Sequence, residues 1–447
     1  MGEDKPEGDG EEVAIEVPIQ PGEPVAAVDA SIEPPYGWVV CIAMHLINGF
    51  TWGIIASYGV YLSYYIDNSI FPGASDLDYT FIGGVNFACA MLCGPIVNMF
   101  VRRLGTHIPM YCGCVMFAGG FVAASFATEY WHLILTQGIL VGLGTGFSWL
   151  PATPILPQWF NRNRSLAQGI AAAGSGIGGV IFSAATTPMI ENLSLAWSLR
   201  ITGILAFVVL FTACSLIRDR NKTIRPSYKP IDTELLKRYQ VWLLIFYTFF
   251  SILGYIVAIY SLGKSAVQYH SNMKLIYFLG AFATSLGLTQ DQGGTVITIM
   301  NVGTAFGRPF IGVLSDRFGR MTVACVLTAS NTLLSYAIWI PANSYGVLIF
   351  FALTVGATSG VYWGTIAPLC AEVVELKELP SALSLMWVTV SMPALFSEAI
   401  ALEIRRPHSS RPYLWPQIYT GLVFLIAGGF MFELRRQKWG FRRERHR

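Results

Sequence analysis

The sequence predicts an all-α polytopic membrane protein with twelve transmembrane helices in two six-helix bundles. Hydrophobic residues make up 53% of the 447 residues and charged residues 13%, and the mean hydropathy is +0.52. That charged share is about half of what a soluble domain usually has. Nearly charge-free runs of about 20 residues, the length that spans a bilayer, recur along the chain. A short basic motif occurs once in each half. The composition excludes a soluble enzyme, a nucleic-acid-binding protein and a disordered protein.

The first 35 residues are acidic. They hold ten acidic residues and one lysine, so they carry −9 and the rest of the chain +11, although the net charge is +2. Four prolines precede Glu33, and the first aromatic residue is Tyr36. We expect residues 1–35 to form a disordered cytosolic tail. No basic region followed by an apolar stretch is present in this tail, so we expect no cleavable signal peptide.

The apolar runs define the expected spans and domains. Spans are predicted near residues 37–62, 79–101, 108–127, 131–158, 165–190, 197–217, 240–262, 292–315, 321–340, 345–369, 380–402 and 413–433. Residues 321–371 carry no charge, and the Pro-Ala-Asn-Ser sequence at 341–344 provides the turn that divides them into two spans. These spans predict four further domains: an N-terminal bundle (36–217), a basic cytosolic linker (218–239), a C-terminal bundle (240–433) and a basic cytosolic tail (434–447).

Lysine and arginine placement sets the expected orientation. With the N-terminus in the cytosol, 22 of the 29 basic residues fall on the cytosolic side and six on the outer side. The positive-inside rule therefore puts both termini in the cytosol. We expect a multi-pass protein of the plasma membrane. All eight cysteines fall within the spans, where free cysteine acts as a small hydrophobic residue, so no disulfide framework and no metal site is predicted.

The two halves of the chain share a motif at an offset of 214 residues. The matched pairs are Pro95 and Pro309, Arg103 and Arg317, and Gly105 and Gly319. Each copy follows the second helix of its half. Six plus six spans with a repeated loop predict two bundles that face each other across a central path.

The second copy is the more complete. Residues 307–320 read GRPFIGVLSDRFGR and resemble the cytosolic loop signature of the major facilitator superfamily. Gly312 permits a close helix–helix approach. Asp316 can pair with a cation or cap a neighbouring helix N-terminus. Arg317 and Arg320 lie near lipid phosphates and helix C-termini. We expect a latch that closes the cytosolic side when a carrier opens outward, and the alternative is a simple positive-inside anchor.

A closer resemblance covers the membrane region. Residues 158–178 read QWFNRNRSLAQGIAAAGSGIG and resemble the helix-five signature of the monocarboxylate-porter family. The Pro-Tyr-Gly-Trp sequence at 35–38 partly resembles the start of that family's helix one. Physically, the glycine and alanine run gives helix five a thin face for close packing, with Gly169, Gly174 and Gly178 on it. This run is not a dinucleotide loop, since no strand precedes it.

Arg308 is the candidate substrate-binding residue. It lies eight residues before Asp316, which places it about 12 Å into the membrane, where ionisable side chains are costly and usually functional. The resemblance implies that it pairs with an anionic substrate, and the alternative is pairing with a carbonyl or carboxylate for gating. The family's lysine on helix one and aspartate on helix eight correspond here to Ala56 and Thr304. Coupling to protons by that pair is therefore not expected, although proton coupling itself stays open.

Further polar and aromatic residues are candidates for the same site. By the resemblance, the aromatic residue that faces substrate on helix ten is Trp363, beside Tyr362, and the two suggest a larger and flatter ligand than lactate. Their alternative role is packing. Asn86 is a polar residue within a span. His45 could titrate near neutral pH, or it could simply be hydrogen-bonded.

Residues 264–279 interrupt the connection between spans seven and eight. Without them, Ser-Leu-Gly at 261–263 joins Ala-Phe-Ala at 281–283 smoothly, and the flanking codons can encode donor and acceptor splice sequences. We hypothesise a retained intron, and the alternative is an outer loop with an interfacial half-helix. A spliced transcript that keeps these codons would exclude the intron.

The predicted function is secondary active transport of a small organic molecule, a carboxylate or related metabolite, by alternating access. One alternative is efflux of a larger secondary metabolite in a fungus, where such carriers often accompany biosynthetic gene clusters. The other is a nutrient sensor that does not transport. No zinc-protease, serine-hydrolase or phosphate-loop motif is present, so no enzyme activity is expected. The expected partners are a small-molecule substrate and the lipid bilayer, with no nucleic acid, metal or cofactor. No accessory membrane partner is identified.

Overall fold

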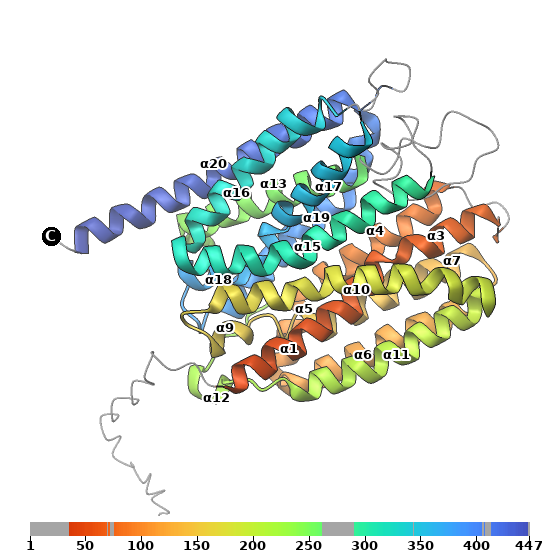
Figure 1. The fold of residues 1–447 in the computed structure, drawn as a ribbon. Coiled ribbons are helices and arrows are strands. Elements are labelled where there is room, and N and C mark those ends of the chain that lie inside the picture. The colour runs from red at the N-terminus through yellow and green to blue at the C-terminus, as the bar shows by residue number, and fades with distance from the viewer. Residues whose placement is uncertain are drawn as a thin grey trace, which may run out of the picture.

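The structure is a computed structural model that describes residues 35–68, 70–71, 76–261, 290–342, 344–404, 406 and 413–445. All regular structure in these ranges is helical. The predicted acidic tail, apart from Pro35, and the insert at 264–279 lie outside the described residues. Figure 1 shows long helices running in a common direction, with the first half of the chain packed against the second.

The N-half (residues 36–217) contains α1 (Tyr36–Asn48), η1 (Gly49–Gly53), α2 (Ile54–Ala56), α3 (Tyr58–Asp67), α4 (Asp76–Leu92), α5 (Gly94–Leu104), α6 (His107–Ala124), α7 (Tyr130–Leu133), η2 (Ile134–Leu140), α8 (Val141–Trp149), α9 (Leu156–Trp159), α10 (Arg164–Asn192) and α11 (Leu195–Leu216). The linker contains α12 (Asn221–Ile224) and η3 (Leu235–Lys237). The C-half (residues 239–445) contains α13 (Tyr239–Ser261), α15 (Gln290–Phe318), α16 (Arg320–Leu334), η4 (Ser335–Trp339), α17 (Tyr345–Ser359), α18 (Val361–Val373), α19 (Leu379–Glu403) and α20 (Leu414–Arg445).

Nine of the described helices are long and apolar enough to cross a membrane, or ten if the bent pair α4 and α5 is one span. The two other predicted spans, near 131–158 and 292–315, coincide with α7–η2–α8 and with α15, which are not among the helices found by this test in the described part of the chain. The prediction of an all-α polytopic membrane protein is confirmed. The count of twelve spans stays a prediction.

Several spans differ from their predicted form. The span predicted at 79–101 is bent by 43° between α4 and α5, where Pro95 begins the new helix. The span at 345–369 is broken at Gly360 into α17 and α18. The helix that contains the last predicted span continues beyond residue 433, because α20 ends at Arg445. Hydropathy marks the apolar part of a helix and not its end, and the arginines and glutamates that follow are good helix formers.

The two halves meet along an inter-half seam, which consists of α10 against α15 and of α4 and α5 against α19. Figure 1 shows α10 and α15 side by side along the middle of the molecule. Each half is also packed internally, α1 against α10 in the first and α13 against α19 and α20 in the second. We call the side that carries the start of α1, the linker and the end of α20 the terminal side, which is the predicted cytosolic side.

Glycines permit the close packing of α10. A Cβ at Gly174 would meet the carbonyl oxygen of His45, and a Cβ at Gly178 would meet that of Gly49. Both obstacles are backbone atoms, which cannot rotate away as a side chain can. The glycine and alanine run therefore brings α10 into backbone contact with α1 and η1.

We predict that Gly178→Val lowers the thermal stability of the purified protein. Overpacking a tight core costs about 1–3 kcal/mol, and here the clash is with backbone. The melting temperature in detergent measures the effect. Gly119→Ala is the control, because a Cβ at Gly119 has no neighbour within 4 Å. Equal melting temperatures for the two variants would contradict the packing role.

The linker is tied to the C-half. The Ser227 amide donates to Lys377 O at 2.6 Å, and the Arg238 guanidinium binds both carboxylate oxygens of Glu378 at 2.7 and 2.8 Å. The hydrogen bond from Arg238 lowers the pKa of Glu378, so this carboxyl stays charged to lower pH than a free glutamate. The connection between the halves thus lies against the terminal side of the C-half.

Candidate functional site

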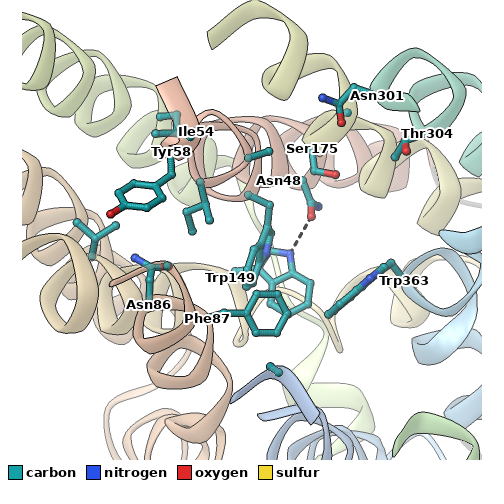
Figure 2. A pocket seen from close by; sticks show the side chains of 18 of the residues that line it. Asn48, Ile54, Tyr58, Asn86, Phe87, Trp149, Ser175, Asn301, Thr304 and Trp363 are labelled. Atoms are coloured by element: carbon teal, nitrogen blue, oxygen red, sulfur yellow. Dashed lines mark hydrogen bonds between the residues drawn. The ribbon is translucent and has the colours of Figure 1, made fainter. Parts of the chain in front are cut away.

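A cavity of about 300 Å³ lies at the inter-half seam, and its wall is mostly apolar. Residues of α1, η1, α2, α3, α4, α6, η2, α8 and α10 contribute from the N-half, and residues of α13, α15, α18 and α19 from the C-half. Figure 2 shows polar side chains at separate places around it, with aromatic rings between them. A mostly apolar cavity with a few polar groups is the usual form of a small-molecule site.

Arg308, on α15, lies in the cavity wall and is 6% exposed. Its Nη1 donates across the seam to the carbonyl oxygen of Ala172 at 2.7 Å and to the hydroxyl of Ser175. Tyr255 of α13 also lies in the cavity wall. Its Nε is buried and has no hydrogen-bond partner among the described residues. Arg308 is thus a buried cation held between the two halves at the cavity.

No carboxylate compensates this charge within the described part of the chain. The residues that line the cavity there include no aspartate or glutamate, and no described carboxylate lies within 4.0 Å of the guanidinium. A buried cation is normally paired, because the desolvation of a lone charge is costly. The Arg308 end of the cavity can therefore bind an anion that comes from outside the chain.

Aromatic rings form the middle of the cavity. Trp52 of η1 lies 5.6 Å from Trp149 of α8 and 6.3 Å from Trp363 of α18, measured between ring centroids. Phe87 of α4 lies 5.2 Å from Trp52 and 6.1 Å from Trp363. Trp149 donates its indole N–H to the Asn48 Oδ1 at 3.0 Å, the bond drawn in Figure 2. We call Trp52, Phe87, Trp149 and Trp363 the aromatic cluster. It lines the cavity with aromatic rings from both halves.

The opposite end of the cavity is polar and uncharged. Asn86 of α4 donates to the backbone oxygen of Gln137 at 2.6 Å, and the Gln137 side-chain amide donates to the Tyr65 hydroxyl at 2.9 Å. Asn86 Oδ1 and Gln137 Oε1 are buried and unpartnered in the described structure. In Figure 2, Asn86 and Thr304 lie on opposite sides of the aromatic rings. Two buried hydrogen-bond acceptors therefore lie at this end without a donor among the described residues.

Two of the π-helical segments shape this wall. η1 carries Trp52, and η2 carries Gln137. A π-turn adds a residue to the helical turn and rotates the side chains that follow, and such turns are frequent at functional sites. An ideal 3.6-residue periodicity cannot place these two residues correctly.

The predicted site residues divide into those in the cavity wall and those outside it. Arg308, Trp363 and Asn86 line the cavity. Tyr362 does not; it is 1% exposed, and its ring lies 6.2 Å from that of Tyr247. His45 does not line the cavity either, and its Nδ1 lies 2.7 Å from the carbonyl oxygen of Ile170 on α10. This contact places His45 between α1 and α10.

Ala56 and Thr304, which the sequence resemblance places at the positions of a lysine and an aspartate, both line the cavity. The Thr304 hydroxyl donates to the carbonyl oxygens of Met300 and Gly356 at 3.0 and 3.2 Å. Neither side chain titrates. These positions thus contribute to the shape of the cavity and not to its charge.

The predicted latch residues connect the halves at the terminal side. Asp316 accepts hydrogen bonds from the backbone amides of Ser165 at 3.0 Å and Leu166 at 2.8 Å, so it caps the N-terminus of α10. Arg320 donates to Asn161 O at 3.0 Å and pairs with Asp316 at 3.2 Å. A Cβ at Gly312 would lie 2.5 Å from Ser165 O. We call Asp316, Arg320 and Gly312 with their α10 partners the inter-half latch.

Glu372 of α18 extends this network. It pairs with Arg320 at 3.4 Å and also with Lys438 of α20. Gly169, on the same face of α10, leaves no room for a Cβ beside the backbone of Arg308. The terminal side is therefore closed in this structure, and the substrate-binding candidate and the latch share the helix pair α10 and α15.

The repeated glycines have the same backbone conformation. Gly105 has φ +79° and Gly319 has φ +96°. Only glycine adopts such angles easily, so each copy of the motif requires glycine at this position. Arg103 and Arg317, the matched arginines, are both exposed at the terminal side. They are free of the inter-half contacts that Arg320 makes.

Several cavity residues could not be identified from the sequence. Trp52, Trp149, Phe87, Ser175 and Tyr255 lie in apolar spans whose cavity-facing side cannot be told from composition. Ser175 belongs to the glycine and alanine run that was interpreted as packing alone. Trp149, two residues before Pro151 in a charge-free span, gave only a weak signal.

Chemically, the cavity offers non-covalent binding. It holds one cation, amide acceptors and aromatic faces. Among the described residues, no group of three or more His, Cys, Asp or Glu that could hold a metal is found. The arrangement can bind an organic anion between two halves that are closed on one side.

The comparisons with known proteins agree with this architecture. A family model described as Major Facilitator Superfamily matches residues 41–284 and 265–443. Probable transporter MCH2 of Saccharomyces cerevisiae is 32% identical over 403 residues, which cover 88% of this chain and 82% of that protein. Agnestins efflux protein AgnL12 of Paecilomyces divaricatus is 25% identical over 90% of this chain and 88% of its own.

A solved structure is also similar. The proton:xylose symporter XylE bound to 6-bromo-6-deoxy-D-glucose has a TM-score of 0.65 and 12% sequence identity. The match covers 92% of this chain and 96% of that chain. At this identity the likeness concerns the fold alone.

Proposed function

Because the chain belongs to the major facilitator superfamily, and is thus a multi-pass membrane transporter and not an enzyme, we propose that it is a secondary carrier for an organic carboxylate. Arg308 pairs with the carboxylate, and the aromatic cluster contacts the rest of the molecule. The substrate is larger and flatter than lactate.

One observation carries this proposal. Arg308 is a buried cation at the interface of the halves, with an unpartnered Nε and no carboxylate of its own within the described residues. A guanidinium presents two N–H groups in a plane that matches a carboxylate. A substrate carboxylate supplies the charge that the protein lacks at this point.

The same contacts support alternating access. Arg308 holds the halves together through Ala172 and Ser175, and the inter-half latch closes the terminal side. A substrate carboxylate that binds the guanidinium weakens the hydrogen bonds from Arg308 to Ala172 and Ser175. The halves can then rock about the α10–α15 pair and expose the cavity to the terminal side, as carriers with repeated halves do.

We further propose that the chain is a carrier of the monocarboxylate-porter type in the plasma membrane, with both termini in the cytosol. The helix-five sequence at 158–178 and the distribution of lysine and arginine support this. Proton movement on the family's lysine and aspartate pair is not part of the proposal, because Ala56 and Thr304 occupy those positions.

Export of a secondary metabolite is the second candidate function. AgnL12 and the Fujikurins efflux protein of Gibberella fujikuroi, 26% identical over 90% of this chain, are named efflux proteins. The aromatic cluster is larger than the surface that a three-carbon acid can contact, which also favours a larger metabolite as the substrate. The carboxylate and its pairing with Arg308 are common to both candidates.

Counterflow in proteoliposomes tests the proposal. Vesicles that contain the purified protein are loaded with 4-phenylbutyrate and diluted into labelled 4-phenylbutyrate, and we expect transient accumulation of label that protein-free vesicles lack. A nutrient sensor that binds without transport gives ligand-dependent thermal stabilisation but no counterflow. Binding without counterflow would overturn the transport proposal.

A further inference from the structure

We propose that the substrate carries a hydrogen-bond donor, a hydroxyl or N–H group, at the end opposite its carboxylate. This donor binds Asn86 and Gln137. The inference rests on the proposed function for the carboxylate end and adds a second recognition site to it. It defines the substrate class as an elongated aromatic or otherwise planar acid with a distal donor.

The orientation of the Asn86 amide leaves its oxygen as the unpartnered atom. Its Nδ2 donates to the backbone oxygen of Gln137 at 2.6 Å. A reversed amide would place oxygen against oxygen at that distance, so the orientation is fixed by its neighbour. Asn86 Oδ1 is then left as an acceptor in the cavity wall, where the described residues give it no donor.

Gln137, like Asn86, has a side-chain oxygen without a donor among the described residues. Its side-chain amide nitrogen donates to the Tyr65 hydroxyl at 2.9 Å, and its Oε1 has no partner in the described structure. Asn86 is 5% exposed and Gln137 is 4% exposed. Buried polar groups are almost always paired, and unpaired ones in a native structure call for an explanation. Two unpaired acceptors on neighbouring elements indicate a ligand that brings donors.

The end of the cavity that holds Asn86 and Gln137 lies opposite the Arg308 end. Asn86 and Thr304, which is on the same helix as Arg308 and one turn before it, lie on opposite sides of the aromatic rings in Figure 2. A single molecule that reaches both ends must pass the aromatic cluster. A planar or ring-containing middle fits there, since aromatic rings stack or meet edge to face.

Asn86 and Gln137 would also make the site specific for a hydroxyl or N–H group at this end of the substrate. A donor pairs with Asn86 and Gln137, but a methyl or methoxy group in the same place leaves both oxygens unpaired. Sites built to hydrogen-bond a hydroxyl reject the analogue that lacks it far more strongly than apolar pockets reject an extra group. The Asn86 end therefore selects among carboxylates that Arg308 alone would accept equally.

Four matched probes test the inference on the purified full-length protein. They are 4-(4-hydroxyphenyl)butyrate, 4-phenylbutyrate, 4-(4-methoxyphenyl)butyrate and the alcohol 4-(4-hydroxyphenyl)butan-1-ol. Dissociation constants come from ligand-dependent thermal stabilisation. We expect the hydroxylated acid to bind about tenfold more tightly than the other two acids, which is the size expected for one buried hydrogen bond and an avoided unpaired acceptor.

Variants assign that preference to its residues. Asn86→Leu should reduce the tenfold ratio to about one and leave the preference for acid over alcohol unchanged. Gln137→Leu is the second variant, in case the loss of the Asn86–Gln137 bond impairs folding, and it should reduce the ratio as well. Asn331→Leu is the control, because Asn331 is buried but lies outside the cavity wall. It should keep the tenfold ratio.

The outcomes separate the inference from the proposed function. Equal binding of the three acids, an unchanged ratio in both variants, or no binding of any probe would overturn the inference. A carboxylate preference without a hydroxyl preference overturns the inference alone and leaves the proposed function standing. Equal binding of the hydroxylated acid and its alcohol overturns the proposed function.

Discussion

Arg308→Ala is expected to abolish transport of an organic anion and to leave the protein folded and in the membrane. The bound carboxylate would lose its only charged partner among the described cavity residues. Breaking a buried ion pair by removal of one partner costs about 3–5 kcal/mol, which corresponds to a loss of at least a hundredfold in affinity. Uptake of labelled 4-phenylbutyrate into proteoliposomes measures the effect.

The thermal stability of the ligand-free protein should not fall in the same variant. Arg308 is buried without a carboxylate in the described structure, so its desolvation destabilises the fold. We expect the melting temperature of Arg308→Ala without ligand to equal or exceed that of the wild type. Arg200→Ala, which removes an arginine that lies over the Phe126 ring outside the cavity, is the control and should keep transport. Unchanged uptake by Arg308→Ala would remove Arg308 from the site.

Asp316→Ala is expected to open the terminal side and to slow transport at least tenfold. Asp316 caps the N-terminus of α10 from the other half through two backbone amides, and an N-cap is worth about 0.5–2 kcal/mol. Loss of the carboxylate also removes one of the two carboxylate partners that the described residues give Arg320, the one at 3.2 Å. The closed state loses both contacts, whereas the state that is open on the terminal side makes neither, so the population shifts toward the open state.

Spin labels on the terminal ends of α10 and α15 can report this shift as a longer distance distribution. Asp316→Asn keeps one acceptor oxygen and should give an intermediate distribution. Glu234→Ala removes a carboxylate of the same side whose ion pair, within the described part of the chain, is with Lys237 of the linker at 2.8 Å, and it should leave the distances unchanged. Identical distributions for Asp316→Ala and the wild type would refute the latch.

The fold could be predicted from the sequence because its determinants are local. A membrane span requires a long apolar run, which hydropathy detects. Helix breaks at Pro95 and Gly360 were not predicted, since whether a proline or glycine bends a span depends on the neighbouring helices. The end of α20 at Arg445 was missed because charged residues beyond the bilayer continue a helix without any apolar signal.

The site was predictable only in part. Arg308 could be identified because a charge deep in a span is conspicuous, and Gly312 and Asp316 because they belong to a specific motif. Tyr362 shows the limit. Two adjacent helical residues point about 100° apart, so only Trp363 of the pair lines the cavity. Asn86 was noted as a polar residue, but its free acceptor depends on a bond to Gln137, 51 residues away, which only the folded chain brings into contact.

The measurement that tests the central claim most directly compares an acid with its uncharged amide. Binding of 4-phenylbutyrate and 4-phenylbutanamide is measured for the wild type and for Arg308→Gln. The two ligands share shape and apolar surface, so their ratio reports only the charge at the Arg308 end. We predict that the wild type prefers the acid about a hundredfold and that Arg308→Gln reduces this ratio to about one. The same ratio in both proteins would contradict the assignment of Arg308 as the residue that binds the substrate carboxylate.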